Sequence, residues 1–386
     1  MKNYQIPKIL FVGGGSGGHL SIIKGLIDYL AENGCNYKNN IMVVGSKLGM
    51  INDPGPSLDE KYIPQLGVPY RFIRSGKFHR ALKLQTFKLV WGVVPGFFDA
   101  KKILQEFRPD IVFATGGYVI VPMVLAAKLM RIKIVLHEQT MTAGLANKIA
   151  SHFADKIFIS FKESESYYPK YKTVLTGNII RKEIFDDKIE KASHAVLINL
   201  MEEAKEAKRD VIYITGGSLG AHKVNMAILK ELETYLEIFT LVWQTGDNQL
   251  HKDYEQIQTK ISTLNNELKS RVFVTKYVND EIGYILHNTK YVICRPGANT
   301  LLELAALGKP AIMVPLWVTS KNDQLQNAKW YADNFAGGII KEKNLNFTNV
   351  MRQISGFEKN DKPVHSKVDY ADAAERVFVQ LRKIVS

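Results

Sequence analysis

Close to the N-terminus, an apolar segment runs into a glycine-rich loop that ends in a histidine. The segment is Lys8–Val12, apolar from Ile9 onward, and the loop is Gly13-Gly14-Gly15-Ser16-Gly17-Gly18-His19. A strand that turns into a helix through glycines presents backbone N–H groups that bind phosphate or diphosphate. A histidine in the first helical turn lies beside that anion, where its imidazole can accept a proton from an attacking hydroxyl. The alternative is that His19 only caps the loop.

A second glycine-rich loop begins the other half of the chain. Residues 211–215 form an apolar strand pattern, Gly216–Gly220 close it, and residues 221–232 have a helical pattern. The chain therefore has two strand–loop–helix units, each at the head of one half. Because ligands of parallel sheets bind at the carboxyl ends of the strands, we expect the two halves to face each other across a ligand cleft.

Two more segments of the first half place polar residues at predicted strand ends. Gly116, Gly117 and Tyr118 follow the strand 111–114 and offer another anion-binding turn, close to the first loop in a parallel sheet. His137 and Glu138 end the strand that begins at residue 133. Polar residues crowded at a strand end usually serve a site, although His137 can equally be a core histidine.

Three further segments offer contacts for a phosphorylated sugar. Arg181 follows Gly177-Asn178 at the boundary of the halves, where it either clamps a phosphate or is a solvated linker residue. Glu303 lies in a helical segment after Gly297-Ala298. Its carboxylate either accepts hydrogen bonds from ribose hydroxyls or is an exposed helix residue favoured by the dipole. The amides of residues 323–328 suit sugar hydroxyls.

The net charge of +13 predicts binding to an anionic partner. Basic residues gather between Arg71 and Arg108, interleaved with aromatic and aliphatic residues. This pattern favours a surface that dips into an anionic lipid leaflet; the alternative is aromatic core residues with a solvated basic rim. The residues expected at the membrane are Lys77, Phe78, Arg80, Leu82, Lys83, Phe87 and Trp91.

The bulk composition indicates an ordered protein of two domains. The chain has 386 residues, of which 46% are hydrophobic and 23% charged. Cys35 and Cys294 are far apart and suggest no disulfide framework or metal site. We expect no export, because the N-terminus has no apolar signal core, and no apolar run reaches the ~20 residues that span a bilayer.

Short apolar runs alternate with helical patterns along the whole chain, which predicts an α/β fold with two doubly wound parallel sheets. A charge-rich helical stretch at 186–208 separates two sets of strands, so the domain boundary falls near 178–185. The predicted strands are 9–12, 41–44, 111–114, 133–137, 156–159, 173–175, 211–215, 240–244, 272–275, 291–294 and 311–314.

Taken together, these motifs resemble the MurG family of UDP-N-acetylglucosamine:lipid-I transferases. The resemblance covers nearly the whole chain and eight ordered motifs, including 13–19, 116–118, 144–148, 216–220 and 295–303. It implies the two-domain glycosyltransferase-B architecture, with Rossmann-like domains facing across a cleft. The N-terminal acceptor and membrane domain would span 1–178 plus a returning helix at 368–386, and the UDP-sugar domain 179–367.

The resemblance also implies an inverting transfer of N-acetylglucosamine from UDP-N-acetylglucosamine to lipid I, which forms lipid II in peptidoglycan synthesis. His19 would be the catalytic base. The donor would be bound by Arg181, Ser218, Val278, Glu303, Gln324 and Asn327. The acceptor diphosphate would be bound by Gly14, Gly15, Ser16, Gly17, Gly18, Gly116, Gly117 and Tyr118. The acceptor side would also include His137, Glu138 and Thr140.

We expect no metal, because the sequence has no Asp-X-Asp pair near a strand end and helix dipoles with an arginine can replace a metal. We expect no cofactor, since UDP-N-acetylglucosamine is a substrate, and we expect the protein to bind peripherally to the cytoplasmic face of the plasma membrane. We expect no nucleic-acid partner. Departures from the family pattern are Ile22, Thr140 and Pro296, where proline, asparagine and serine are common. The alternatives are a UDP-sugar-dependent diacylglycerol glycolipid synthase and a non-catalytic nucleotide-sugar-binding protein. A nicotinamide oxidoreductase is disfavoured, because no acidic residue ends the strand 41–44.

Overall fold

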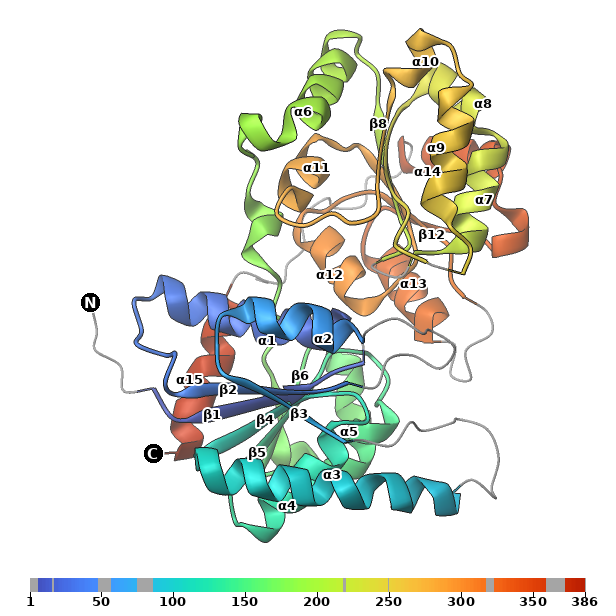
Figure 1. Ribbon diagram of the computed structural model, residues 1–386. Helices are drawn as coiled ribbons and strands as arrows, with labels where there is room; N and C mark the ends of the chain where they lie inside the picture. The colour runs from blue at the N-terminus through green and yellow to red at the C-terminus, as the bar shows by residue number, and fades with distance from the viewer. Residues whose placement is uncertain are drawn as a thin grey trace. The chain divides into compact units, whose positions relative to one another are not determined.

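The computed structural model describes residues 6–15, 17–47, 57–74, 86–217, 220–248, 250–316, 323–358 and 372–385 (Figure 1). The side chains of residues 58, 86–92 and 191 lie outside this description. The chain divides into two compact units. Unit 1 is Met1–Arg181 with Tyr370–Ser386, and unit 2 is Lys182–Asp369. Each unit is an α/β fold with one parallel sheet, which confirms the predicted fold class.

Unit 1 is built on a seven-stranded sheet in the order β3-β2-β1-β4-β5-β6-β7. Its strands are β1 (Ile9–Gly13), β2 (Ile41–Ser46), β3 (Tyr70–Ile73), β4 (Ile111–Gly116), β5 (Lys133–Glu138), β6 (Lys156–Ile159) and β7 (Thr173–Leu175). The strand order reverses between β1 and β4. Crevices for ligands open at the carboxyl ends of strands at such a switch point. The two glycine-rich loops of this unit follow β1 and β4 and therefore meet there.

Helices cover both faces of this sheet (Figure 1). Because side chains alternate along a strand, Leu10 and Val12 join a core under α3, α4 and α5, whereas Ile9 and Phe11 join a core under α1 and α15. The helices are α1 (Gly17–Glu32), α2 (Leu58–Tyr62), α3 (Thr86–Phe107), α4 (Ile120–Leu129), α5 (Leu145–Ala150) and α15 (Ala373–Val385), with short 3-10 turns η1 (Ile63–Leu66), η3 (Lys162–Tyr167) and η4 (Lys170–Lys172).

The C-terminal helix α15 belongs to unit 1, although the elements that precede it in the sequence belong to unit 2 (Figure 1). Its buried residues repeat at helical spacing: Ala373, Val377, Phe378 and Leu381. They share the core that contains α1 and β1, and the Phe378 ring lies 6.0 Å from that of Tyr29 on α1. Unit 1 is therefore completed by both ends of the chain.

Unit 2 repeats the plan with six parallel strands in the order β10-β9-β8-β11-β12-β13. The strands are β8 (Val211–Thr215), β9 (Thr240–Gln244), β10 (Val272–Thr275), β11 (Tyr291–Cys294), β12 (Ala311–Met313) and β13 (Gly337–Ile339). The helices are α6 (Lys191–Glu206), α7 (His222–Lys230), α8 (Leu232–Ile238), α9 (Asp253–Ser262), α10 (Asn266–Lys269), α11 (Ile282–Asn288), α12 (Ala298–Ala306), α13 (Asp323–Asn334) and α14 (Phe347–Glu358), with η5 (Lys182–Phe185) and η6 (Glu342–Asn344). The order reverses between β8 and β11.

All eleven predicted strands are present, but two strands were not predicted. The strand β3 at the edge of its sheet is largely exposed, so it lacks the apolar run by which parallel strands are recognised. This strand contains Arg71 and Phe72, which begin the predicted basic and aromatic segment. The helix predicted over 221–232 is interrupted at Glu231, where α7 ends and α8 begins. Within the described ranges, no helix is long and apolar enough to cross a membrane.

Candidate active site

The two glycine-rich loops of unit 1 are in direct contact. The Gly14 N–H donates to the Gly116 carbonyl at 3.4 Å, and the Thr115 hydroxyl donates to the His19 carbonyl at 3.2 Å. Gly117 has a φ of +82°, and a Cβ atom there would lie 2.2 Å from the Gly14 carbonyl oxygen. Only glycine allows so close a backbone approach at a positive φ. The loops after β1 and β4 are therefore joined and form a single surface.

His19 lies where the loops after β1 and β4 join. Its ring packs against Gly116, where a Cβ atom would stand 2.4 Å from His19 Cε1. The side chain is half-buried, and its Nδ1 is buried with no hydrogen-bond partner in the part of the chain that the structure describes. Burial lowers the pKa of His19, and the negative charge of Glu138 and a hydrogen bond to Gln139 oppose that effect. The imidazole is therefore neutral near pH 7, as a proton acceptor must be.

Gln139 connects the ends of two strands beneath His19. Its side chain is 4% exposed, and its Nε2 donates to the Thr115 carbonyl at 2.7 Å. A buried amide that is satisfied in this way fixes the backbone it contacts. This residue was not among the predicted site residues, although it is adjacent to two that were.

Glu138 is a buried carboxylate that organises the segment after β5. It accepts hydrogen bonds from the Gly144 N–H at 3.1 Å, from Asn147 Nδ2 at 3.0 Å and from the Tyr168 hydroxyl at 2.7 Å. Thr140 contributes its N–H at 3.1 Å and its hydroxyl at 2.7 Å. Burial and the nearby carboxylate raise the pKa of Tyr168, which remains a donor. Glu138 and Thr140 thus shape this loop through internal contacts.

His137 is a core residue in this structure. Its side chain is fully buried beside the Phe113 ring, at 6.0 Å between ring centres, and its Nε2 lies 3.4 Å from the Gly177 carbonyl. Burial lowers its pKa to about 4. The ring is therefore uncharged at neutral pH, which matches the core alternative that the sequence left open.

Asp59 is a buried residue in contact with the first glycine-rich loop that the sequence analysis did not single out. Its carboxylate is 1% exposed and accepts the Gly15 N–H at 3.0 Å and the Ser46 N–H at 2.9 Å. The Gly15 N–H is therefore occupied within the protein, contrary to our expectation that it faces the acceptor diphosphate. The one sequence signal was the capping box Ser57–Glu60, which places Asp59 in the first turn of a short helix.

In unit 2, the loop after β8 is anchored on the neighbouring strand. The Gly217 N–H donates to Thr215 Oγ1 at 3.0 Å, and Gln244 Nε2 donates to the Gly217 carbonyl at 3.3 Å. Gly220 has a φ of +71°, and a Cβ atom there would lie 2.0 Å from the Thr245 carbonyl oxygen. Ser218, the predicted donor contact of this loop, lies outside the described residues.

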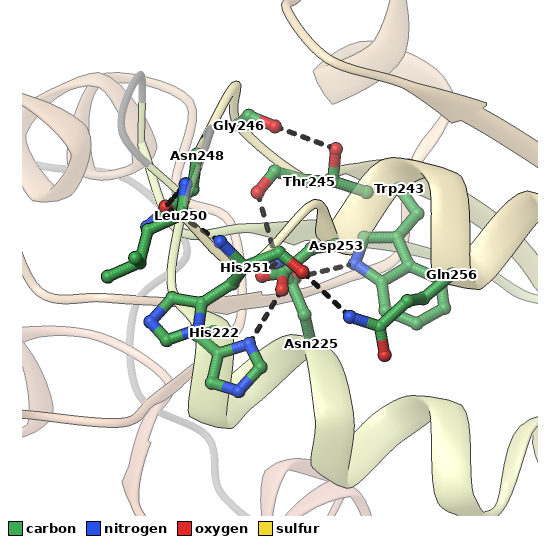
Figure 2. Close-up of polar contacts among 10 residues, drawn as sticks. All are labelled: His222, Asn225, Trp243, Thr245, Gly246, Asn248, Leu250, His251, Asp253 and Gln256. Carbon is green, nitrogen blue, oxygen red and sulfur yellow. Dashed lines mark hydrogen bonds and ion pairs between the residues drawn. The ribbon is translucent and has the colours of Figure 1, made fainter. Parts of the chain in front are cut away.

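A polar network beside this loop was also not predicted (Figure 2). The buried Asp253 carboxylate lies 2.6 Å from His222 Nδ1 and accepts Asn225 Nδ2 at 2.7 Å. Trp243 Nε1 donates to Asn225 Oδ1 at 3.0 Å, and the rings of His222 and His251 stack at 3.9 Å (Figure 2). The network fixes the start of α7 against β9 and α9.

The other predicted donor residues lie on different elements. Val278 is buried after β10, and Glu303 is half-buried in the second turn of α12. Gln324 Oε1 accepts the Leu316 N–H at 2.8 Å. Asn327 is 5% exposed and donates to the Pro296 carbonyl at 3.0 Å, so its amide joins α13 to the loop after β11. Arg181 is half-buried at the end of unit 1.

The predicted membrane segment is only partly described. Lys77, Phe78, Arg80, Leu82 and Lys83 lie outside the described residues, as do Ser16 of the first loop and the side chains of Phe87 and Trp91. Further along α3, Val94 is 44% exposed and Phe98 is 61% exposed. Within the described ranges, no group of three or more His, Cys, Asp or Glu side chains could hold a metal ion.

Comparisons with known proteins identify the class to which this fold and site belong. Residues 9–159 match the model of the glycosyltransferase family 28 N-terminal domain, and residues 211–378 match that of its C-terminal domain. In fold, the chain is similar to the crystal structure of Acinetobacter baumannii MurG, with a TM-score of 0.66, 23% identity and coverage of 98% and 100% of the two chains. It is also similar to a Neisseria meningitidis UDP-GlcNAc 2-epimerase bound to UDP-GlcNAc, with a TM-score of 0.62, 16% identity and coverage of 97% and 99%. The protein is a two-domain glycosyltransferase with the glycosyltransferase-B fold.

Proteins related in sequence identify the family within this class of glycosyltransferases. One from Bacillus cereus is 32% identical over 98% of this chain and 99% of its own length. One from Clostridium botulinum is 34% identical over 92% of this chain and 91% of its own length. Both are named UDP-N-acetylglucosamine–N-acetylmuramyl-(pentapeptide) pyrophosphoryl-undecaprenol N-acetylglucosamine transferases. The chain belongs to this family of N-acetylglucosaminyltransferases within glycosyltransferase family 28, as the motifs predicted.

Proposed function

We propose that the protein transfers N-acetylglucosamine from UDP-N-acetylglucosamine to undecaprenyl-diphosphate-linked N-acetylmuramoyl pentapeptide. The family supports this reaction, and the observation that carries the chemistry is the neutral His19 imidazole at the joined glycine-rich loops. An enzyme of this class needs a base for the acceptor hydroxyl and stabilisation for the leaving diphosphate.

The acceptor hydroxyl attacks the anomeric carbon with inversion, and a bond forms between that oxygen and the sugar. The hydroxyl proton passes to His19, and the bond between the anomeric carbon and the UDP oxygen breaks with its electron pair going to UDP. The position of His19 at the joined loops and its lowered pKa support its role as the base. A lowered pKa keeps the imidazole in its neutral form at the pH of the cytoplasm.

The acceptor diphosphate is assigned to the joined loops after β1 and β4. Gly17 and Gly18 open the 16-residue helix α1, whose N-terminus favours an anion. Gly116, Gly117 and Tyr118 face the same switch point from β4. The Gly15 N–H is excluded from this set, since Asp59 accepts it. His137, Glu138 and Thr140 support the acceptor side indirectly, through the internal contacts described above.

The donor is assigned to unit 2 and to Arg181. Glu303 on α12 accepts hydrogen bonds from the ribose hydroxyls. The backbone near Val278 contacts the uracil, and Gln324 contacts the sugar. Asn327 supports the neighbouring loop through Pro296. Arg181 and the loop of Ser218 stabilise the leaving diphosphate, so that the reaction requires no metal and no cofactor.

We also propose peripheral binding to the cytoplasmic face of the plasma membrane, where a lipid-linked acceptor is found. The exposed apolar side chains Val94 and Phe98 on α3 support this binding, because large apolar groups in contact with water mark interaction surfaces. In the sequence they follow shortly after the predicted basic and aromatic segment 77–91.

The test of this function is product formation. The protein is incubated with radiolabelled UDP-N-acetylglucosamine and lipid I in one reaction, and with diacylglycerol in another. We expect label in the lipid-I product alone. Label in diacylglycerol alone would identify a glycolipid synthase, and binding of donor with no labelled lipid would identify a non-catalytic binding protein.

A further inference from the structure

A negatively charged side chain is built into the first glycine-rich loop of unit 1. The Asp59 carboxylate uses one oxygen for the Gly15 N–H and the other for the Ser46 N–H. Gly15 lies between β1 and α1, and Ser46 ends β2. One carboxylate thus joins the ends of two neighbouring strands at the edge of the sheet where the active site lies.

The surrounding sequence makes room for this carboxylate. A Cβ atom at Gly14 would stand 2.1 Å from Asp59 Oδ2, and one at Gly45 would stand 3.1 Å from the same oxygen. Ser57 begins the helix of Asp59 and donates through its hydroxyl to the Ser46 carbonyl at 2.9 Å. Both ends of the contact are therefore held, and the side chain has little freedom to rotate away.

Burying this carboxylate costs folding free energy, which some role at this position must offset. Asp59 is 1% exposed, and among the described residues no basic side chain forms an ion pair with it. Burial raises its pKa, and the two N–H bonds oppose that rise. A buried carboxylate that accepts two backbone N–H groups fixes those donors firmly, because hydrogen bonds to an ionised acceptor are about twice as strong as neutral ones.

The backbone fixed in this way leads directly to the proposed base. Gly15 is separated from His19 by three residues, its φ is +78°, and a Cβ atom there would lie 3.2 Å from Tyr118 Cε1. We propose that Asp59 is a positioning residue, which acts through Gly15 to set the loop that carries His19 and contacts the acceptor diphosphate. This inference rests on the proposed function, because it concerns the alignment of the base in that reaction.

The experiment measures sugar transfer by Asp59→Asn at saturating donor and acceptor. An amide offers one acceptor oxygen and turns an NH₂ group toward the second N–H donor, so one of the two bonds is lost. We expect kcat to fall about 10–100-fold, the range for a small misplacement of a catalytic group, while the KM for UDP-N-acetylglucosamine stays within twofold. Should Asp59→Asn fail to fold, the smaller Asp59→Ser, which keeps one acceptor oxygen, replaces it in every comparison.

The matched control is Asp155→Asn. Asp155 also accepts one backbone N–H, that of Ile134 at 2.8 Å, but at the amino end of the sheet. We expect it to lower thermal stability with a kcat within twofold of wild type. Equal losses of kcat in Asp155→Asn and Asp59→Asn would mean that Asp59 matters only for folding, and would overturn the inference.

A double-mutant cycle separates positioning from general stability. In the His19→Ala background, Asp59→Asn should change kcat less than twofold, because two residues that act as one unit are not additive. The same fold-loss in both backgrounds would overturn the inference. If His19→Ala itself transfers sugar at the wild-type rate, the proposed function of His19 fails, and that result is distinct from a failure of Asp59.

Discussion

The imidazole of His19 rests on the backbone of Gly116, so that a Cβ atom on residue 116 would stand 2.4 Å from His19 Cε1. The contact joins two loops that are about a hundred residues apart in the sequence. It explains why the second loop must be glycine at this point and why the two loops act as one site. Gly116 therefore has a packing role beside its proposed role in binding diphosphate.

The first prediction concerns that contact. Gly116→Ala should lower kcat about 10²-fold, because the added methyl group displaces the His19 ring, and should leave UDP binding unchanged, since UDP is assigned to unit 2. Steady-state kinetics and calorimetric UDP titration measure the two effects. Gly34→Ala is the control: Gly34 also has a positive φ, of +66°, but has no atom within 4 Å of an added Cβ. If both variants keep wild-type kcat, His19 does not depend on this contact.

The pH dependence of the reaction follows from the state of His19. A base must be neutral, so kcat/KM falls as the pH drops through the pKa of His19 in the free enzyme. Because burial lowers that pKa from its ordinary value of 6.5, the acid limb of the kcat/KM profile should lie below pH 6.5. Rates from pH 4.5 to 9 measure it. An acid limb above pH 6.5 would contradict the environment described for His19.

His137 should make the stability of the protein depend on pH. Its pKa in the folded protein is about 4, below the ordinary value of 6.5, so the unfolded chain binds the proton first as the pH falls. Stability is therefore full above pH 6.5 and is lost between pH 6.5 and 4, by roughly 3 kcal/mol. Urea unfolding at both pH values measures this loss. A His137→Gln variant should lose less stability between pH 6.5 and 4 than the wild type. Equal losses of stability in wild type and variant would assign the effect to other groups.

Membrane binding should depend on the exposed apolar end of α3. Phe98→Asp removes an apolar side chain that is 61% exposed and adds a charge, so it should reduce co-sedimentation with anionic vesicles. Leu250→Asp is the control, because Leu250 is 83% exposed but belongs to unit 2, whereas the proposed membrane surface belongs to unit 1. Equal co-sedimentation of wild type and Phe98→Asp would show that α3 is ordinary domain surface.

The sequence predicted the sheets well, because buried parallel strands are short apolar runs. It missed β3, whose edge position leaves Tyr70 37% exposed, and β13, where Gly337 and Gly338 conceal the strand. Both exceptions lie at sheet edges. There, pairing on one side only removes the requirement for a continuous apolar pattern.

The site was predicted only in part. Glycines and a histidine in one loop are visible in a sequence, and His19 was proposed as the base in that way. Asp59 was missed because its partners, Gly15 and Ser46, are backbone groups that leave no trace in residue types. His222 and Asp253 were missed because a pair 31 residues apart has no local pattern.

The central claim is that His19 is the base of the transfer reaction, and single-turnover kinetics of His19→Ala with lipid I test it most directly. We predict a rate of sugar transfer lower by about 10²–10⁴-fold, the range for loss of a general base, with UDP affinity unchanged. The remaining rate should no longer show the acid limb below pH 6.5. A His19→Ala protein that transfers sugar at the wild-type rate would contradict the account.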